Sequence, residues 1–485
     1  MKRLIYWVFF FVQAWQLQAQ NTFEVSVGKT TDEAGFSIVE NPSGEFIITG
    51  LIENENNEEI LPYIVKISPE GELLAEKKLN NYPGSSCLFL DSYYYDNCYY
   101  FTGIEIPNDS ICTNLLLYKI DSSLSIVFSK KYGISQGKEA FYASVSLDSD
   151  TNFIITGYVY PKEQFFSSYP YFYKLNINGD SITSKVWDST NHKGFSYHIL
   201  ESGDKHYYYA FCDIPFGTGS VVKLTKDFDS LAYYTPTTEI WSYYTALPLA
   251  DSNFLVAGKD WQYGTMRIGA QVLNSSFEPI AYNYFITSID TNDIPAFYGC
   301  ADIASDTNFY IGGTSHVNPA NPYFSTTDSK FHLIKTDNLL NPVWERWYGG
   351  DACYFMHSLI ATQDGGCAMV GTRYDENTQN NERDIYVIKV NADGLVTWEK
   401  EIPIPQSLAQ VYPNPGKDRI VLRSSVAEGD FRLTDMASKV LIEREISQKS
   451  TAIDTQELPA GIYLWSLTKD GNQVASGKWV KAETK

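Results

Sequence analysis

The sequence repeats one hydrophobic phrase seven times, and this repeat constrains the fold more than any other feature. The phrase is a hydrophobic run that ends in a small residue, as in the two identical runs FIITG at 46–50 and 153–157. Units of this size cannot bury their own faces and must stack on their neighbours. An aromatic residue opens six copies, and Cys367 takes that place in the seventh: Phe46, Tyr99, Phe153, Tyr207, Phe254 and Phe309.

Two further positions recur with the phrase. A glycine closes six copies, with Phe211 in its place in the fourth copy, and we interpret it as a mark of crowding near a central channel, where a Cβ has little room. A lysine recurs in the next run. We interpret it as a strand residue that covers a blade edge with its stem and keeps its head in water, rather than as a functional ring of charge. The glycines are Gly50, Gly103, Gly157, Gly258, Gly313 and Gly371; the lysines are Lys66, Lys119, Lys174, Lys223, Lys335 and Lys389.

Each copy is built from β-forming residues separated by turn-forming Asp, Asn, Ser, Pro and Gly. In the first copy these runs predict four strands, at 35–40, 45–52, 63–68 and 73–79. Four antiparallel strands per unit, seven times over, predict an all-β fold: a seven-bladed β-propeller over residues 20–405. A solenoid is the weaker alternative, because it would need capping repeats. Residues 23–27 resemble the closing strand of a unit, and we expect them to pair with the seventh blade as a ring lock.

The N-terminal residues 1–19 have the pattern of a secretory signal peptide. Lys2 and Arg3 precede an apolar stretch at 4–12, and Leu17-Gln18-Ala19 forms a cleavage site before Gln20. No later stretch approaches the roughly 18 uninterrupted apolar residues of a transmembrane helix. The sequence therefore predicts an exported protein with no transmembrane segment.

Seven cysteines are present, which is an odd number, and their spacing matches no metal-binding pattern. We interpret most of them as small buried apolar residues. A disulfide between Cys87 and Cys98, on consecutive strands of the second unit, is the most plausible exception.

The repeats are strongly acidic. Of 37 Lys and Arg residues, 11 lie from 406 onward and 2 in the signal peptide, which leaves 24; of 58 Asp and Glu residues, 10 lie from 406 onward, which leaves 48. A surface with this excess repels nucleic acids and anionic lipid heads. It is compatible with neutral glycans, cationic partners or divalent cations.

A different pattern begins after residue 405. Short alternating runs at 419–423, 431–435, 440–444 and 477–481 predict a small Ig-like β-sandwich over residues 406–485.

These C-terminal residues resemble the sorting domain of type IX secretion cargo, type A class. The ordered elements that carry the resemblance are Pro413-Asn414-Pro415, the turn residue Asp435, Leu458-Pro459, Gly461, Tyr463 and the final strand Lys478-Trp479-Val480-Lys481. Ala437-Ser438 stand where the family usually has glycine, which leaves the turn type open. The resemblance implies a partner, the type IX secretion machinery. It also implies passage over the outer membrane of a Gram-negative bacterium, usually followed by removal of the domain and attachment to the cell surface or release.

No catalytic, cofactor-binding or metal-binding residue is predicted. The six histidines form no HExxH pattern, and no GxSxG elbow, P-loop or GxGxxG fingerprint is present. The run Asp148-Ser-Asp150-Thr-Asn152 places oxygen ligands on alternate residues, as in a Ca²⁺ loop, but it lacks the later Gly and Glu, and we interpret it as a turn. Carboxylates that converge from different blades cannot be recognised in sequence.

The connections between the second and third strands of the units vary most, and in a closed ring they emerge on one face. Variable loops on a rigid scaffold commonly carry function. We predict a non-enzymatic module that binds a glycan or a protein through aromatic residues there. Local packing is the alternative role for these residues. A hydrolase or lyase acting on a polysaccharide or peptide in the central depression is the alternative function. The candidates are Tyr160, Phe165, Phe166, Trp261, Tyr263, Tyr323, Phe324 and Tyr374.

Overall fold

The structure is a computed structural model. It describes residues 21–482 apart from 29–30, 54–58, 81–83, 108–112, 135–137, 162–167, 188–193, 214–217, 236–239, 263, 289, 324–328, 377–381, 397–408, 425–427, 437–438, 449 and 470–471. The chain divides into two compact units, Met1–Trp398 and Glu399–Lys485. The predicted signal peptide lies outside the described residues, and the predicted domain limits at 19/20 and 405/406 stay predictions.

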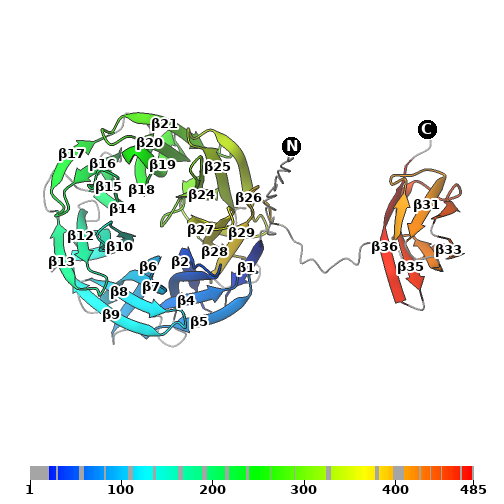
Figure 1. Ribbon diagram of the computed structural model, residues 1–485, viewed down its shortest axis with the longest axis horizontal. Coiled ribbons are helices and arrows are strands. Elements are labelled where there is room, and N and C mark those ends of the chain that lie inside the picture. The colour runs from blue at the N-terminus through cyan, green and yellow to red at the C-terminus, as the bar shows by residue number, and fades with distance from the viewer. Residues whose placement is uncertain are drawn as a thin grey trace, which may run out of the picture. The chain divides into compact units, whose positions relative to one another are not determined.

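Seven sheets of the first unit are arranged in a ring over the described residues (Figure 1), which is the predicted propeller. Every neighbouring pair of strands within a sheet is antiparallel. In each blade the first strand of the repeat is innermost. From the inside outward, blades 1 to 3 are β2 (Glu33–Glu40), β3 (Phe46–Glu53), β4 (Ile60–Ile67), β5 (Leu73–Lys78); β6 (Ser85–Tyr95), β7 (Cys98–Pro107), β8 (Asn114–Asp121), β9 (Ile126–Gly133); and β10 (Lys138–Leu147), β11 (Phe153–Pro161), β12 (Tyr169–Leu175), β13 (Ser181–Val186).

The remaining blades follow the same order, with two exceptions. In blade 6 two short strands, β22 and β23, share the innermost place and both pair with β24. In blade 7 the outermost strand comes from the N-terminus. These blades are β14 (Gly194–Glu201), β15 (Tyr207–Asp213), β16 (Thr218–Leu224), β17 (Ser230–Tyr234); β18 (Ile240–Pro248), β19 (Phe254–Gln262), β20 (Thr265–Leu273), β21 (Pro279–Phe285); β22 (Ile294–Pro295), β23 (Ala301–Ser305), β24 (Asn308–Ser315), β25 (Lys330–Asp337), β26 (Pro342–Tyr348); and β27 (Cys353–Ala361), β28 (Cys367–Tyr374), β29 (Asp384–Val390), β1 (Phe23–Val27).

The ring is closed by the N-terminal strand, as predicted. β1 pairs with β29 from Phe23 opposite Lys389 to Val27 opposite Ile385. The Phe23 ring lies edge-on to Phe46 of the first blade, with ring centroids 5.6 Å apart. Phe23 and Val27 are both buried. One short strand therefore joins the last blade to the first through backbone bonds and apolar packing.

The recurrent glycine has the predicted cause, and the structure identifies what crowds it. The innermost strands of blades 1 to 5 and of blade 7 carry a bulge, for example between Gly35 and Ser37, and the carbonyl before the bulge points at the second strand. In blade 6 the Ile294 carbonyl of β22 takes this place. A Cβ on Gly50 would lie 1.8 Å from the Ala34 carbonyl oxygen, and one on Gly258 would lie 1.8 Å from that of Ser242. Gly103, Gly313 and Gly371 meet a carbonyl in the same way. The glycine thus makes room for a bulged neighbouring strand.

A second bulge, on six outermost strands, was not predicted. In each of them the register shifts by one residue beside the third strand. The bulged residue is aliphatic and about half exposed. A bulge that turns an edge strand away protects it against pairing with another chain. These residues are Leu74, Val127, Ile182, Leu231, Ile280 and Val343.

The recurrent lysine packs differently from the prediction. Lys66 pairs with Glu45 at 2.8 Å and Lys223 pairs with Asp204 at 2.7 Å. Lys389 is only 3% exposed and is bound to Asp364. The prediction that the lysine head stays in water is therefore wrong for Lys389, because the turn between the first two strands supplies a carboxylate that replaces the water.

The cysteines whose side chains the structure describes are mostly buried, as expected. Cys87, Cys300, Cys353 and Cys367 are buried and unbridged. The predicted bridge between Cys87 and Cys98 is wrong, since neither cysteine forms a disulfide. Cys98 pairs with Tyr95 beside the hairpin turn, whereas Cys87 pairs with Glu105 near the far end of the same hairpin. The two thiols are therefore separated along the strands.

The second unit is a small β-sandwich around its own core, which includes Phe431, Trp465 and Trp479. One of its sheets has the order β30-β31-β34 and the other β33-β32-β35-β36. No helix in the described ranges has both the length and the apolar character needed to cross a bilayer. The strands are β30 (Ala409–Tyr412), β31 (Arg419–Ser424), β32 (Gly429–Thr434), β33 (Val440–Ile446), β34 (Ser450–Asp454), β35 (Gly461–Lys469) and β36 (Asn472–Lys481).

The ring-lock role of β1 predicts that Phe23→Ala lowers the stability of the whole propeller. We expect a loss of about 3 kcal/mol, since a large buried ring leaves a cavity behind. Thermal unfolding of the full chain measures the loss. Ser26→Ala on the exposed side of the same strand is the control and should change stability by no more than about 0.5 kcal/mol. An unchanged melting temperature for Phe23→Ala would show that β1 does not hold the ring.

The close approach at Gly50 predicts that Gly50→Ala destabilises the first blade by about 1–3 kcal/mol or more, because the new methyl group collides with a main-chain carbonyl. Gly133→Ala is the matched control. A Cβ there would meet only the Asn114 side chain, at 4.0 Å, so we expect a neutral or slightly stabilising effect. Urea unfolding of the two variants compares them. Equal stabilities would contradict the steric explanation.

Candidate functional site

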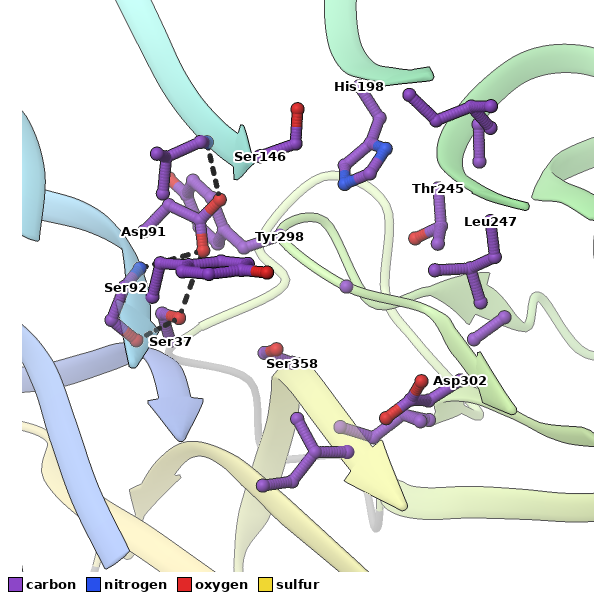
Figure 2. Close-up of a pocket in the computed structure, with 18 of the residues that line it drawn as sticks. Ser37, Asp91, Ser92, Ser146, His198, Thr245, Leu247, Tyr298, Asp302 and Ser358 are labelled. Atoms are coloured by element: carbon purple, nitrogen blue, oxygen red, sulfur yellow. Dashed lines mark hydrogen bonds between the residues drawn. The ribbon is translucent and has the colours of Figure 1, made fainter. Parts of the chain in front are cut away.

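A cavity of about 360 Å³ lies at the centre of the ring, and all seven blades contribute to its wall through their innermost strands. Its lining mixes carboxylates and hydroxyls with aliphatic residues. Asp91 of β6 and Asp302 of β23 lie on opposite sides of it, and His198 of β14 reaches it from a third direction (Figure 2). The hydroxyl-bearing residues that line it are Ser37, Ser92, Ser146, Thr245, Tyr93, Tyr298 and Ser358.

The mouth of the cavity lies on the face opposite the variable loops. Along β18 the wall runs from buried Thr245 and Ala246 through half-buried Leu247 to exposed Pro248, at the end of the strand. The innermost strands end at the turns that lead into their second strands. The cavity therefore opens toward those turns and not toward the loops between second and third strands.

Asp91 ties three blades together. Its Oδ1 accepts hydrogen bonds from the Ser37 hydroxyl of blade 1 at 3.1 Å and from the Ser92 N–H at 2.8 Å. Its Oδ2 accepts the Val145 N–H of blade 3 at 2.9 Å. Burial raises the pKa of Asp91 to about 6, although these hydrogen bonds favour the charged form.

Asp302 makes the same kind of bond between blades 6 and 7. Its Oδ2 accepts the Ala361 N–H of β27 at 2.8 Å, and its Oδ1 accepts the Ile303 N–H at 2.8 Å. Burial raises the pKa of Asp302 to about 6. Thr245 repeats the arrangement, because its hydroxyl accepts the Cys300 N–H of the next blade at 2.8 Å. These side chains satisfy backbone groups that face the channel.

His198 is neutral at physiological pH, because burial lowers its pKa to about 4. Its bond to the backbone of Ala246 raises the pKa in part. A bond that favours the protonated ring must be donated by the ring, so the backbone atom is the carbonyl oxygen. The Nδ1 atom is buried and has no hydrogen-bond partner among the residues that the structure describes.

An aromatic plug separates the cavity from the loop face. The chain between β22 and β23 lies against β27, where the Tyr298 N–H donates to the His357 carbonyl at 2.8 Å. Phe36 packs on Tyr298 and on His357, with both pairs of ring centroids 5.0 Å apart. Tyr323 covers Phe355 at 4.7 Å and lies nearly parallel to His357 at 5.9 Å. Burial lowers the pKa of His357 to about 3, so this plug holds a neutral imidazole.

The run at 148–152 is a turn, as interpreted from the sequence. Asp148 Oδ1 accepts the N–H groups of Asp150 and Asn152, at 3.0 and 2.7 Å. Its Oδ2 accepts the Tyr207 hydroxyl and faces Lys226 at 3.7 Å. Within the described ranges, no group of three or more His, Cys, Asp or Glu residues could hold a metal ion.

Two of the predicted loop residues are packed rather than free. Tyr374 is 8% exposed, and Tyr323 belongs to the aromatic plug. Tyr160 is half-buried, with its ring 6.4 Å from that of Tyr158. Four predicted residues lie outside the described part of the chain: Phe165, Phe166, Tyr263 and Phe324.

Trp261 is half-buried and forms an aromatic pair that the sequence did not show. It stacks on Trp241, with ring centroids 5.4 Å apart and an interplanar angle of 29°. Trp241 is 37% exposed and is a bulged residue at the loop-face end of β18. Phe141 of β10 is 40% exposed in the same way beside Tyr158. The predicted residues lie in the loops, so Trp241 and Phe141 were not among them; the available signal was an aromatic residue in the first half of a first strand.

Most of the sorting residues, which run from Pro413 to Lys481 in the sequence, meet in one corner of the second unit. The Asn414 side chain donates to the Lys478 carbonyl at 2.7 Å and accepts the Val480 N–H at 2.9 Å, so it brackets Trp479. The Trp479 indole N–H donates to the Pro413 carbonyl at 3.0 Å, and Trp479 is fully buried. The Pro413-Asn414-Pro415 segment is thus joined to the last strand.

The middle sorting element joins the same corner. Tyr463 lies in β35, which begins at Gly461 and follows Leu458-Pro459. Its hydroxyl donates to the Pro459 carbonyl at 2.6 Å, and its ring centroid lies 5.6 Å from that of Trp479. Lys481 is buried and donates to the Thr455 carbonyl at 2.6 Å. Lys478 is exposed. Lys481 therefore has a structural role, whereas Lys478 is available to a partner.

Comparison with known proteins agrees with this division. Residues 410–482 match the family described as the secretion system C-terminal sorting domain, so the second unit is the predicted type IX sorting domain. No curated protein matches the sequence.

Solved structures that resemble this chain do so at low identity. They include the propeller domain of the Trilobed protease from Pyrococcus furiosus (10% identity, 78% of this chain and 100% of that chain, TM-score 0.43). The α-L-arabinofuranosidase Arb93A from Fusarium graminearum is similar at 11% identity (77% and 98%, TM-score 0.40). PorZ, a surface component of the type IX secretion system of Porphyromonas gingivalis, is similar at 10% (93% and 82%, TM-score 0.22). These likenesses concern the fold alone.

Proposed function

We propose that this chain, a propeller joined to a type IX sorting domain, is an exported binding module of the cell surface or extracellular space. The propeller binds a glycan or a protein through its loop face and performs no chemistry. We favour a neutral glycan as the ligand. The observation that carries the proposal is the stack of exposed Trp241 on half-buried Trp261, supported by exposed Phe141 and half-buried Tyr160 on the same face.

Aromatic faces of this kind suit sugars, because the apolar C–H face of a sugar ring packs on an aromatic ring. The charge of the propeller narrows the choice of sugar. The repeats hold twice as many acidic as basic residues, 48 against 24. An anionic polymer would be repelled, whereas a neutral polysaccharide would not.

The alternative is a secreted hydrolase or lyase, and one observation favours it. Asp91 and Asp302 face one cavity, and the pKa of each is raised to about 6, as for a general acid. Against it, each carboxylate already accepts backbone N–H bonds that join neighbouring blades. A residue with that structural role is poorly placed to exchange protons or to attack a substrate.

Two segments, the predicted signal peptide at residues 1–19 and the C-terminal sorting domain, indicate that the protein is exported in two steps. The N-terminal signal peptide crosses the inner membrane, and the sorting domain directs passage over the outer membrane and is then removed. We therefore expect the mature protein to begin at Gln20 and to end near Pro405. Intact-mass measurement of protein recovered from the medium or cell surface tests this. A mass that still includes Lys485 would show that the sorting domain is retained.

Binding is tested on a glycan array with the exported protein. Trp241→Ala and Trp261→Ala should each weaken binding to any glycan hit about tenfold or more, as for an anchoring aromatic residue. Leu231→Ala, which removes an exposed aliphatic side chain from an outermost strand, is the control and should bind normally. Product analysis on each hit completes the test: soluble products that disappear in Asp91→Asn or Asp302→Asn would favour the enzyme over the binding module.

A further inference from the structure

The central cavity has an excess of hydrogen-bond acceptors and no cationic side chain among its described lining residues. Its titratable groups are Asp91, Tyr93, His198, Glu201, Tyr298 and Asp302. Glu201, at the rim, is paired with Lys226 at 2.9 Å. The charges of Asp91 and Asp302 have no such partner, because their hydrogen bonds come from neutral N–H and hydroxyl groups.

Asp302 has acceptor capacity to spare. A carboxylate offers about four lone-pair sites. The N–H groups of Ile303 and Ala361 occupy one site on each oxygen of Asp302, which leaves one further site on each. Asp91 accepts three hydrogen bonds and has less capacity left. Asp302 is therefore the better anchor for a molecule in the cavity.

His198 supplies a separate observation. Its ring donates to the Ala246 carbonyl, so the buried Nδ1 of the neutral ring presents a lone pair. A buried lone pair without a partner costs free energy, and the neutral ring brings no positive charge to the cavity wall. The neutral imidazole thus leaves the charge of the carboxylates uncompensated, and the carboxylates call for a donor that carries positive charge.

We propose that the central cavity binds a small organic molecule through a protonated primary amine, with Asp302 as the principal anchor. An ammonium group offers three donors and no acceptor, which complements this lining. Because Asp91 lies across the cavity from Asp302 (Figure 2), a second amine at the far end of the molecule would strengthen binding. A volume of about 360 Å³ lies at the lower end of the range for small-molecule sites.

Other ligand classes fit less well. A Ca²⁺ or Mg²⁺ ion needs about six oxygen ligands around one point, and no group of three candidate ligands occurs in the described part of the chain. A neutral polyol would hydrogen-bond to the hydroxyls but would leave two desolvated carboxylates without a counter-charge. This site is distinct from the loop face, from which the aromatic plug separates it.

Calorimetry on the exported protein at pH 7.5 tests the proposal with three probes of one length. These are 1,5-diaminopentane, 1-aminopentane and 1,5-pentanediol. We expect the diamine to bind most tightly, the monoamine more weakly and the diol not at all. Trp261→Ala on the loop face should leave diamine binding unchanged, so the test is independent of the glycan proposal.

Asp302→Asn should weaken diamine binding about tenfold to hundredfold, since a charge-assisted bond is lost. Its amide oxygen can still accept the Ala361 N–H and keep the blades joined. Asp306→Asn, which removes an exposed charge from the turn after β23, is the matched control and should bind like the native protein. If Asp302→Asn does not fold, Ser358→Lys replaces it: an ammonium carried into the cavity should raise the melting temperature and prevent diamine binding.

Three outcomes would overturn the proposal. The diol could bind as tightly as the diamine, which would show that charge is not recognised. The diamine could fail to bind, or could bind Asp302→Asn and Asp306→Asn equally. Displacement of the diamine by Ca²⁺ at a stoichiometry of one, with loss of Ca²⁺ binding in Asp302→Asn, would instead identify a metal site.

Discussion

Hydrogen bonds between neighbouring innermost strands hold the centre of this propeller together, and much of the molecule depends on them. Asp91, Thr245 and Asp302 each accept a backbone N–H from the next blade, across sequence separations of 54, 55 and 59 residues. Innermost strands have one edge with no strand beside it, and their N–H groups need acceptors. The short side chains of Asp91, Thr245 and Asp302 supply them. Because these separations are about one repeat long, each bond reaches the neighbouring blade.

This arrangement explains why the central cavity is chemically unusual. Carboxylates recruited to join blades are buried without cations, and burial raises the pKa of both to about 6. Raised pKa values at a cavity often accompany catalysis, yet here structure alone accounts for them. What remains is a cavity rich in acceptors, and this chemistry favours a bound donor over a reaction. The Trp241–Trp261 stack lies on the other face, away from the carboxylates that join neighbouring blades.

In the sorting domain, a few residues hold together segments that are distant in the sequence. Asn414 and Trp479 bind each other's backbone neighbours, so the segment that opens the domain is fastened to the strand that closes it. The sequence elements by which the family is recognised therefore pack against one another in the folded domain. Of the basic residues in the last strand, Lys481 is used internally, and Lys478 remains on the surface.

The sequence by itself determined the all-β class, the seven repeats, the closing role of residues 23–27 and the sorting domain. The fold class, the repeats and the closing strand follow from local β-propensity, turn residues and spacing, whereas the sorting domain is recognised by its resemblance to a known family. The tertiary structure alone decided what the units build together. Asp91 and Asp302 are 211 positions apart, and no local pattern places them on one cavity. Trp241 was identified only as the stacking partner of Trp261 in the structure. Cys87 and Cys98 are separate because the hairpin register, and not their proximity in the sequence, sets the distance between their side chains. Ring closure brings innermost strands together, and the contacts it creates have no signature in any single repeat.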